Sequence, residues 1–547
     1  MTDTSNPDVL VAGAGPGGLL LACELALAGV RCTLLERRTH PSPLSRASGL
    51  QARSLELLAM RGLTDEFLDR SNPHDHIQLE PGGARLDLRR LDTEFRQLSV
   101  CPQHVTENIL EDHARELGVR VERGVAVLDV GQDSEGVTVR VEGPEGAGER
   151  RAAWLVGFDG VHSTVREQAG IGFPGVTFPW DVFLGDVRLT RPAPDGMLVK
   201  VNEHGMVVAI DFGTGVWRMG VVNPHPHLPG KPVCVDEMAE ALKKIIGYEL
   251  GPHDPSHTGS RFAFQRRIAT TYRAGRILLG GDAAHVHPPI GAQGMNLSIQ
   301  DAMNLGWKLA AVVRGRAAPS LLDTYERERR PVAERTLKVT DRVMRVSMHP
   351  HPLPRRLRAR LVPLLMGRRA LNDRLARHVS NIAVAYPPTG GGRGSLIGRR
   401  VPNLAMTGPG GAMEHLFDRF RSAPFVLVDQ SPGGRLAEAA APWGDRVAAV
   451  AARITGGSEF SRHDGVLVRP DGYCAWAGAP SDVVGLRTAL TTWCGSPTPV
   501  PVQEPVQEPG PAPGRAPGPA SDPEPVPRSR PESGPDSTGA AAGGLTR

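Results

Sequence analysis

The stretch that decides the fold class is Val9-Leu10-Val11-Ala12-Gly13-Ala14-Gly15-Pro16-Gly17-Gly18. An apolar run that ends in the spacing Gly-x-Gly-x-x-Gly predicts a strand, a tight turn and a helix whose amino end faces a pyrophosphate. Glu36 ends the next predicted strand, where a carboxylate can bind the ribose hydroxyls of an adenosine. Arg37 could read a 2′-phosphate, but Glu36 argues against a purely NADP-type site. A glycine-rich turn without ligand is the alternative. The residues predicted to hold a dinucleotide are Gly13, Gly15, Pro16, Gly17, Gly18, Glu36 and Arg37.

A second passage from strand to helix lies at residues 275–296. Its strand ends in Gly280-Gly281-Asp282, and a loop containing prolines and glycines leads into a helix over 297–313. A buried aspartate at a strand end suits a ribityl hydroxyl, and glycines before a helix suit a flat ring lying on the backbone. A metal at Asp282, His285 and His287 is the alternative. Histidines at i and i+2 are not a usual ligand spacing, so we expect no metal.

Length and composition narrow the remaining choices. The chain has 547 residues, enough for about three domains. With 63 bases against 59 acids the net charge is +4, so we expect no nucleic-acid partner. The most apolar window, 9–29, contains glycines, a proline and Glu24, and no basic segment precedes it. We therefore expect no membrane span and no signal peptide. Six cysteines without a CxxC pair favour a reducing cytoplasm.

The order of patterns along the chain predicts an α/β fold with three parts. Strand and helix patterns alternate in the first part, which we assign to a discontinuous Rossmann-like domain that ends in linking helices. Two insertions of alternating strands predict one antiparallel β-sheet, the substrate (middle) domain. The predicted boundaries are 1–72, 100–174 and 270–395 for the Rossmann-like domain, 73–99 and 175–269 for the middle domain, and 396–494 for a small C-terminal domain.

Two segments have an unusual composition. Residues 495–547 contain no aromatic residue, and 14 of the 49 prolines lie in 497–535, so we expect a disordered, proline-rich tail. A proline-rich ligand for a partner is the alternative. Between Arg342 and Arg377 ten arginines occur with one acid, Asp373. Such a basic amphipathic segment could touch a membrane or nucleic acid, but a solvated helix that links two domains is the favoured interpretation.

A third motif makes the pattern resemble a known family. Residues 154–166 read Trp-Leu-Val-Gly-Phe-Asp-Gly-Val-His-Ser-Thr-Val-Arg. Together with the first two motifs this segment resembles the class A FAD-dependent aromatic monooxygenases, the para-hydroxybenzoate and phenol hydroxylase family. Within it, the chain is most similar to actinomycete polyketide hydroxylases and rifampicin monooxygenase. Phe158 and His162 depart from the family pattern. The blocks 400–403 and 467–476 resemble the thioredoxin-like C-terminal domain of the polyketide hydroxylases, without a CxxC pair for redox work.

The resemblance implies further cofactor contacts. It assigns FAD to the glycine-rich cradle, and it implies that Arg46 gates the flavin between two positions. No catalytic side chain is obligatory. The positions that the resemblance adds are Arg46, Gln103, Val127, Asp159, Asp282, Pro289, Gly294, Met295 and Asn296.

The function implied is that of an FAD-dependent monooxygenase. NADPH or NADH would bind transiently, because no second Gly-x-Gly-x-x-Gly follows a strand. Through a C4a-hydroperoxyflavin, O2 would hydroxylate a large aromatic or polyketide-type substrate in antibiotic or secondary metabolism. The alternatives are Baeyer–Villiger insertion, antibiotic inactivation, and a flavin-binding protein without turnover. A homodimer is compatible with the pattern of the C-terminal domain.

A side-chain base for the substrate is not evident from the sequence. None of the five tyrosines lies in 73–99 or 175–225, so a tyrosine base is not expected unless Tyr272 reaches the pocket. Asp211, His204 and Arg218 are candidate polar pocket residues, although such residues more commonly lie on strand faces or in turns.

Overall fold

The computed structural model describes residues 6–41, 47–79, 84–191, 193, 195–226, 231, 233–247, 249, 259–349, 351–389, 395–422 and 424–498. Arg46 and the tail from residue 499 onward lie outside these described residues. Residues 495–498 of the predicted tail are described, and they are hydrogen-bonded: Trp443 Nε1 donates to the carbonyl oxygen of Gly495 (2.7 Å), and the Thr498 N–H donates to Pro442 (2.9 Å).

A six-stranded sheet forms the centre of the predicted Rossmann-like domain, with the order β18-β19-β12-β1-β2-β8. All pairings are parallel except that of β18 with β19. The four strands β1, β2, β12 and β19 are buried along their whole length, as a parallel sheet covered on both faces requires. The bounds are β1 Val9–Ala12, β2 Cys32–Glu36, β8 Arg120–Arg123, β12 Trp154–Gly157, β18 Arg273–Ala274 and β19 Ile277–Leu279.

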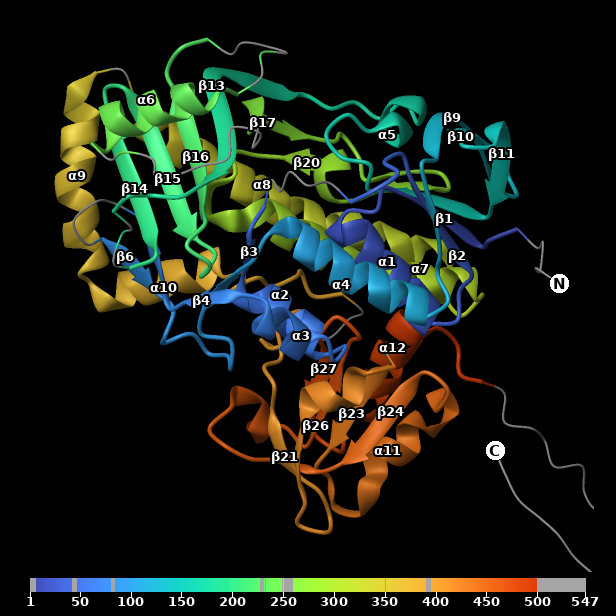
Figure 1. Ribbon diagram of the computed structural model, residues 1–547. Helices are drawn as coiled ribbons and strands as arrows, with labels where there is room; N and C mark the ends of the chain where they lie inside the picture. The colour runs from blue at the N-terminus through green and yellow to red at the C-terminus, as the bar shows by residue number, and fades with distance from the viewer. Residues whose placement is uncertain are drawn as a thin grey trace, which may run out of the picture. The chain divides into compact units, whose positions relative to one another are not determined.

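Helices cover this sheet as the β-α-β prediction requires. The helix after the glycine-rich turn, α1, packs against both α4 and α7 (Figure 1). A smaller antiparallel sheet, β11-β10-β9, stands beside the central one. The bounds are α1 Pro16–Leu27, α2 Ala52–Ala59, α3 Thr64–Asp69, α4 Gln103–Glu116, α5 Thr164–Gln168, α7 Gln293–Val313, β9 Ala126–Gln132, β10 Val137–Gly143 and β11 Gly146–Ala152.

The middle sheet has the order β14-β15-β16-β13-β17-β20, and all its pairings are antiparallel. Alternate side chains face opposite sides: Phe183, Val207 and Met219 pack with residues of α6, whereas Val182, Met206 and Val222 line a cavity on the other face. The last strand, β20, belongs to the second sequence motif. The bounds are β13 Gly175–Val187, β14 Met197–Asn202, β15 Gly205–Asp211, β16 Trp217–Asn223, β17 Ser260–Ile268, β20 His285–Val286 and α6 Val235–Ile245.

The first insertion does not join this sheet, so that part of the prediction was wrong. Among the described strands, β5 (His76–Gln78) pairs with β6 (Arg85–Asp87) alone, and β4 (Asn72–His74) and β7 (Leu98–Val100) join β3 (Gly49–Leu50) in a separate sheet. The physical reason lies in α10 (Arg369–Val379). There Asn372 accepts the N–H of Asp87 (2.9 Å) and donates to the carbonyl of Arg85 (2.7 Å), so a side chain takes the place of a neighbouring strand.

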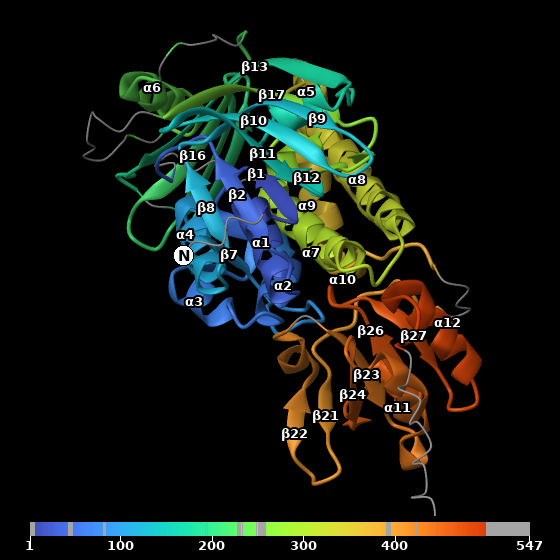
Figure 2. The same ribbon diagram turned by 90° about the vertical axis from the view of Figure 1, so that its right-hand side faces the viewer.

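The C-terminal domain is built on a four-stranded sheet, β24-β23-β26-β27, with α11 and α12 (Figure 2). Its core continues into the Rossmann-like domain, because Trp307 of α7 packs edge-on against Phe425 (5.3 Å) and Trp493 (5.9 Å). The bounds are β21 Ala405–Thr407, β22 Met413–His415, β23 Phe425–Asp429, β24 Val447–Ala451, β25 Arg453–Ile454, β26 Gly465–Val468, β27 Cys474–Gly478, α11 Arg435–Ala440 and α12 Val483–Cys494.

Three helices connect the domains: α8 (Asp323–Ser347), α9 (Pro352–Met366) and α10 (Arg369–Val379). The basic segment 342–377 spans the end of α8, all of α9 and most of α10, and several leucines of α9 are exposed. Leu353 and Leu364 are 64% and 63% exposed. Within the described part of the chain, no helix combines the length and the apolar character needed to cross a membrane.

Candidate functional site

A cavity of about 1630 Å³ connects the glycine-rich turn after β1 with the inner face of the middle sheet. Asn296 is buried near this wall without lining it, and the structure does not describe Arg46. The predicted site residues that line the cavity are Gly13, Gly15, Pro16, Gly17, Gly18, Glu36, Arg37, Gln103, Val127, Asp159, Asp282, Pro289, Gly294 and Met295.

Two glycines show where the wall of this cavity is closed and where it is open. Gly13 has a φ of +102°, and a Cβ there would stand 2.4 Å from the carbonyl oxygen of Phe158, so only glycine permits this approach. At Gly15 no heavy atom lies within 4 Å of the Cβ position. The backbone at Gly15 therefore borders the open space of the cavity at the amino end of α1, where a pyrophosphate fits.

The Glu36 carboxylate is held in place at the end of β2. It is buried, and its two oxygens accept the backbone N–H groups of Ala14 (2.8 Å) and Arg38 (2.9 Å). Each carboxylate oxygen can accept more than one hydrogen bond. Glu36 therefore keeps acceptor capacity toward the cavity that it lines, as a ribose site requires.

The Asp159 side chain is hydrogen-bonded to residues of its own segment. Its carboxylate accepts hydrogen bonds from Ser163 Oγ (2.5 Å) and from the N–H of Val165 (3.1 Å) at the start of α5. Burial raises the pKa of Asp159, while these donors oppose the rise. The side chain thus stabilises the turn that follows β12.

Asp282 has a different environment from the one predicted. The expectation of a buried side chain was wrong: Asp282 lies in a 3-10 turn, Gly281–Ala283 (η1), and is exposed to the cavity. The reason is that strand β19 ends at Leu279, so the aspartate belongs to the turn and not to the strand end. This position suits a hydrogen bond to a ligand.

We expect Asp282→Ala to weaken binding of FAD by about 10- to 100-fold, since a hydrogen bond to a charged group contributes about 1.5–3 kcal/mol. Asp159→Ala should affect thermal stability more than FAD affinity, because its partners belong to the protein. Titration of the apoprotein with FAD measures both dissociation constants. Equal dissociation constants for wild type and Asp282→Ala would contradict the assignment.

The amino end of α7 opens onto the same cavity. Its preceding residue, Ala292, has φ +53°, and the first-turn residues Gly294 and Met295 line the cavity. Asn296, predicted as a cofactor contact, uses its side chain to donate to the Gly49 carbonyl (2.8 Å) and to accept the Gln51 N–H (2.8 Å). The first-turn amides of a helix have no intrahelical partner, so they are suited to a developing negative charge.

Gln103 and Gln293 fix the two loops around this opening. Gln103 accepts the N–H of Ala47 (3.1 Å) and donates to Glu107 (2.7 Å). Gln293, which the sequence did not single out, donates to the Val379 carbonyl (2.8 Å) and accepts from Asn381 (3.0 Å). The end of α10 thereby holds the start of α7.

Asp301 of α7 is a second residue that the sequence did not single out. It is 1% exposed and accepts three hydrogen bonds, from the Gly281 N–H (3.2 Å), His285 Nε2 (2.6 Å) and Arg329 Nε (2.7 Å). Burial alone would raise the pKa of Asp301, but the Arg329 guanidinium and His285 outweigh it and hold the pKa below the ordinary value. An ionised carboxylate thus lies directly beneath the η1 turn.

The histidines of the second motif have hydrogen-bond partners within the protein. His285 is bound to Asp301, whereas Nδ1 of His287 lies 2.8 Å from the carbonyl of Pro288. Burial lowers the pKa of His287 to about 4, so it is neutral at pH 7. Within the described ranges, no group of three or more His, Cys, Asp or Glu residues is arranged to hold a metal ion.

Two families of known proteins match this chain. The family of FAD-binding domains matches residues 6–340, and the aromatic-ring hydroxylase C-terminal family matches residues 394–497. The chain belongs to the FAD-binding aromatic-ring hydroxylases. It is a flavoprotein monooxygenase, as the resemblance implied.

Relatives of this hydroxylase act in antibiotic chemistry. The 12-dehydrotetracycline 5-monooxygenase/anhydrotetracycline 6-monooxygenase of Streptomyces rimosus is 41% identical over 504 residues, which cover 90% of this chain and 99% of that protein. Rifampicin monooxygenase of Streptomyces venezuelae is 39% identical over 499 residues, with 90% and 99% covered. The structure of an anhydrotetracycline hydroxylase from Streptomyces rimosus superimposes with a TM-score of 0.82 at 40% identity and covers 90% of this chain and 100% of that one.

The substrate side of the hydroxylase contains few of the polar residues that the sequence suggested. Arg218 lines the cavity and forms an ion pair with Asp186, whereas His204 and Asp211 do not line it. Tyr272 is fully buried and does not line it either. None of the four tyrosines that the structure describes borders the cavity, so a tyrosine base is not supported.

Proposed function

We propose that this hydroxylase uses NADPH or NADH and O2 to insert one oxygen atom into a large aromatic, polyketide-type substrate. For a hydroxylation the balance is substrate–H + O2 + NAD(P)H + H⁺ → substrate–OH + H2O + NAD(P)⁺. Bound FAD would accept the hydride and activate O2. The six cysteines form no disulfide in the described chain, which supports a reducing, cytoplasmic setting.

The observation that carries this proposal is the continuity of the cavity. One end has the glycine turn, Glu36 and Asp282, and the other has an apolar wall from the middle sheet and from α8 and α10. A volume of about 1630 Å³ exceeds the roughly 300–1,000 Å³ of a usual small-molecule site. It therefore suits a dinucleotide together with a polycyclic substrate.

Protein groups would position the reactants and exclude water. The glycine turn and Glu36 would bind the adenosine diphosphate part of FAD, and Asp282 would bind the ribityl chain. The amides of Gly294 and Met295 would stabilise negative charge on the reduced ring. The apolar side chains of the middle sheet would keep the oxidising site dry.

We expect anhydrotetracycline or rifampicin, the compounds named for two relatives, to stimulate NADPH oxidation and oxygen uptake by the FAD-loaded protein at least tenfold. A single dinucleotide cradle leaves the nicotinamide without a deep site of its own, so the flavin must move to meet it, and substrate would favour that position. An oxygen electrode and mass spectrometry with ¹⁸O2 measure uptake and incorporation. If no aromatic substrate stimulated oxygen uptake, the alternative of a flavin-binding protein without turnover would be favoured.

The products distinguish the remaining alternatives. Hydroxylation and Baeyer–Villiger insertion both add one oxygen atom, so the carbon connectivity of the product must be determined by NMR. Conversion of rifampicin with loss of antibacterial activity would favour drug inactivation over biosynthesis.

We also propose that the substrate carries an ionised acidic group. Arg335 of α8 and Arg374 of α10 are exposed and line the cavity, and neither makes an ion pair among the described residues. Among the described residues of the cavity wall, the acidic ones lie on the flavin side, namely Glu36, Glu107, Asp159 and Asp282. A substrate chamber whose described wall contains cations but no acids favours a carboxylate or enolate.

We expect Arg335→Gln and Arg374→Gln each to weaken binding of anhydrotetracycline about 2- to 5-fold, since exposed ion pairs contribute about 0.2–1 kcal/mol. Perturbation of the flavin absorbance reports binding, and the effect should shrink at high salt. The matched controls are Arg342→Gln and Arg377→Gln, which lie exposed on the same helices and do not line the cavity. Equal losses of affinity in the control variants would show that Arg335 and Arg374 do not recognise the substrate.

A further inference from the structure

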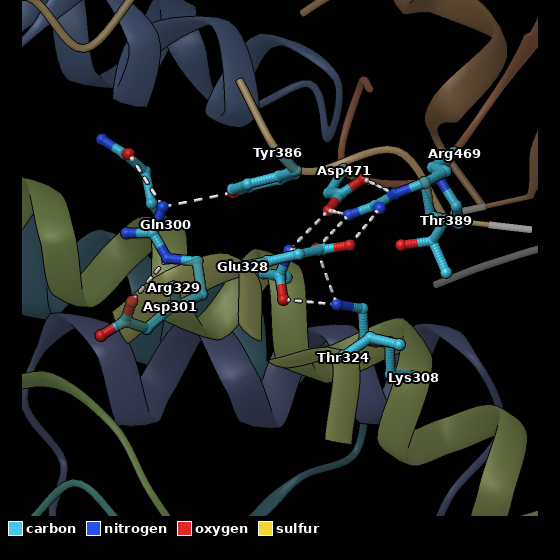
Figure 3. A network of polar contacts seen from close by, with 12 residues as sticks. Gln300, Asp301, Lys308, Thr324, Glu328, Arg329, Tyr386, Thr389, Arg469 and Asp471 are labelled. Atoms are coloured by element: carbon cyan, nitrogen blue, oxygen red, sulfur yellow. Dashed lines mark hydrogen bonds and ion pairs between the residues drawn. The ribbon is translucent and has the colours of Figure 1, made fainter. Parts of the chain in front are cut away.

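A buried network of charges joins the C-terminal domain to α7 and α8 (Figure 3). Arg469, which follows β26, binds the Glu328 carboxylate through both terminal nitrogens (2.7 and 2.8 Å) and also binds Asp471 (2.9 Å). Lys308 of α7 donates to Glu328 Oε2 (2.8 Å), which also accepts from Arg469 Nη2. These four side chains are at most 2% exposed. The C-terminal domain is therefore anchored on α8 by a desolvated, charge-balanced cluster.

The next residue of α8 carries the connection toward the flavin side. Arg329 donates Nε–H to Asp301 (2.7 Å) and Nη1–H to the Tyr386 hydroxyl (3.2 Å). Consecutive helical residues point about 100° apart. Glu328 and Arg329 thus contact different partners from adjacent positions, as Figure 3 shows.

Residues of the C-terminal domain also contact Tyr386, the second partner of Arg329. The ring of Tyr386 lies 4.1 Å from that of Tyr473, and the Arg469 guanidinium lies 5.3 Å from its centre. The Tyr386 N–H donates to the carbonyl of Gly398 (2.8 Å), whose own N–H donates to Cys474 (2.8 Å). The hydroxyl that receives Arg329 is thereby positioned by residues of the C-terminal domain.

Asp301 connects Arg329 to the η1 turn at the cavity. It binds the N–H of Gly281 and the ring of His285, on either side of Asp282, which lines the cavity. A shift of Arg329 would leave the buried Asp301 carboxylate without its cationic partner, and the η1 turn would lose its fixed anchor.

We propose that the C-terminal domain sets the position of the η1 turn, and so the affinity and environment of the flavin, through Glu328 and Arg329. In this arrangement Asp301 and Arg329 are positioning residues, and Arg469 is the contribution of the C-terminal domain. The inference rests on the proposed contact of Asp282 with the flavin. It gives a domain without a CxxC pair a role in positioning the turn that carries Asp282.

The test uses full-length, FAD-loaded protein with Arg469→Met, Tyr386→Phe and Asp301→Asn. We expect each variant to raise the FAD dissociation constant, about 3-fold for Tyr386→Phe and at least 10-fold for the other two. The visible spectrum and the midpoint potential of the remaining bound flavin should shift as well, which a purely structural role would not cause. Tyr386→Phe removes one hydroxyl and is the variant that should fold normally.

The matched control is Asp429→Asn, within the C-terminal domain. Asp429 is 3% exposed, and its side chain accepts hydrogen bonds from Ser431 and Ala437, both within its own domain. It should lower the melting temperature without changing the FAD dissociation constant or the flavin potential. Wild-type flavin properties in Arg469→Met, or an equal loss in Asp429→Asn, would overturn the proposal. A wild-type protein that binds no FAD would instead refute the flavin site itself.

Discussion

Gly15→Val should abolish FAD binding and leave the apoprotein folded. Gly15 has φ −78° and ψ 174°, an extended conformation that valine readily adopts. Its Cβ position has no heavy atom within 4 Å, so the added Cβ does not clash with the surrounding protein. It would instead occupy the space at the amino end of α1 where the pyrophosphate is expected. We expect FAD affinity to fall at least 100-fold, which is about 2.7 kcal/mol.

Two other glycines provide the controls for this measurement. Gly131 of β9 also has no heavy atom within 4 Å of its Cβ position, but it does not line the cavity. Gly131→Val should therefore bind FAD normally. Gly13→Ala should fail to fold, because φ is +102° and the Cβ would stand 2.4 Å from a backbone oxygen. Flavin fluorescence and circular dichroism separate these three outcomes, and a yellow Gly15→Val protein with normal affinity would contradict the cradle assignment.

Glu328→Ala should destabilise the protein by about 3–5 kcal/mol. The carboxylate is 2% exposed and is shared by Lys308 and Arg469. Removing one partner from a buried ionic cluster leaves uncompensated charge in a poorly solvated place. Urea unfolding followed by fluorescence measures the change. Glu334→Ala on the same helix is the control: its side chain is 40% exposed, and it should change stability by less than about 0.5 kcal/mol.

The same residue predicts how stability depends on pH. Burial alone would raise the pKa of Glu328, but Arg469 and Lys308 outweigh burial and hold the pKa well below the ordinary value of 4.5. The unfolded chain therefore binds this proton at higher pH than the folded chain does. The stabilisation is fully present above about pH 4.5 and is lost as the pH falls toward the folded-state pKa. Below pH 4.5 wild type should lose stability more steeply than Glu328→Ala, and parallel curves would contradict the assignment.

The cradle could be predicted from the sequence because its signal is local. The glycine spacing and Glu36 lie within a single β-α-β unit, and the conformation of each residue follows from its neighbours. The cofactor class needed the two later motifs, whose meaning came from family resemblance. The burial of Asp282 was predicted wrongly because the end of β19 cannot be placed to within two residues from an apolar run.

The network around Arg329 could not be predicted because its members are distant in the chain. Nothing near Glu328 indicates that its partner stands at Arg469, 141 residues later. One signal was present: Asp301 and Lys308 are the two charged residues of α7, which has an apolar face, and buried charged groups require partners. The failure of residues 73–99 to join the middle sheet has a similar origin, since Asn372 that binds β6 belongs to a helix far along the chain.

The pairing of β20 with β17 limits how this enzyme can be rebuilt by domain exchange. Ile268 and His285 are partners in that ladder, so the last strand of the middle sheet is also the segment that follows η1. In a chimera whose middle domain is exchanged between residues 175 and 269, the native β20 would have to pair with a foreign β17. The transplantable cassette must extend through residue 286 and include the aspartate-bearing turn, so substrate range and flavin seating are inherited together.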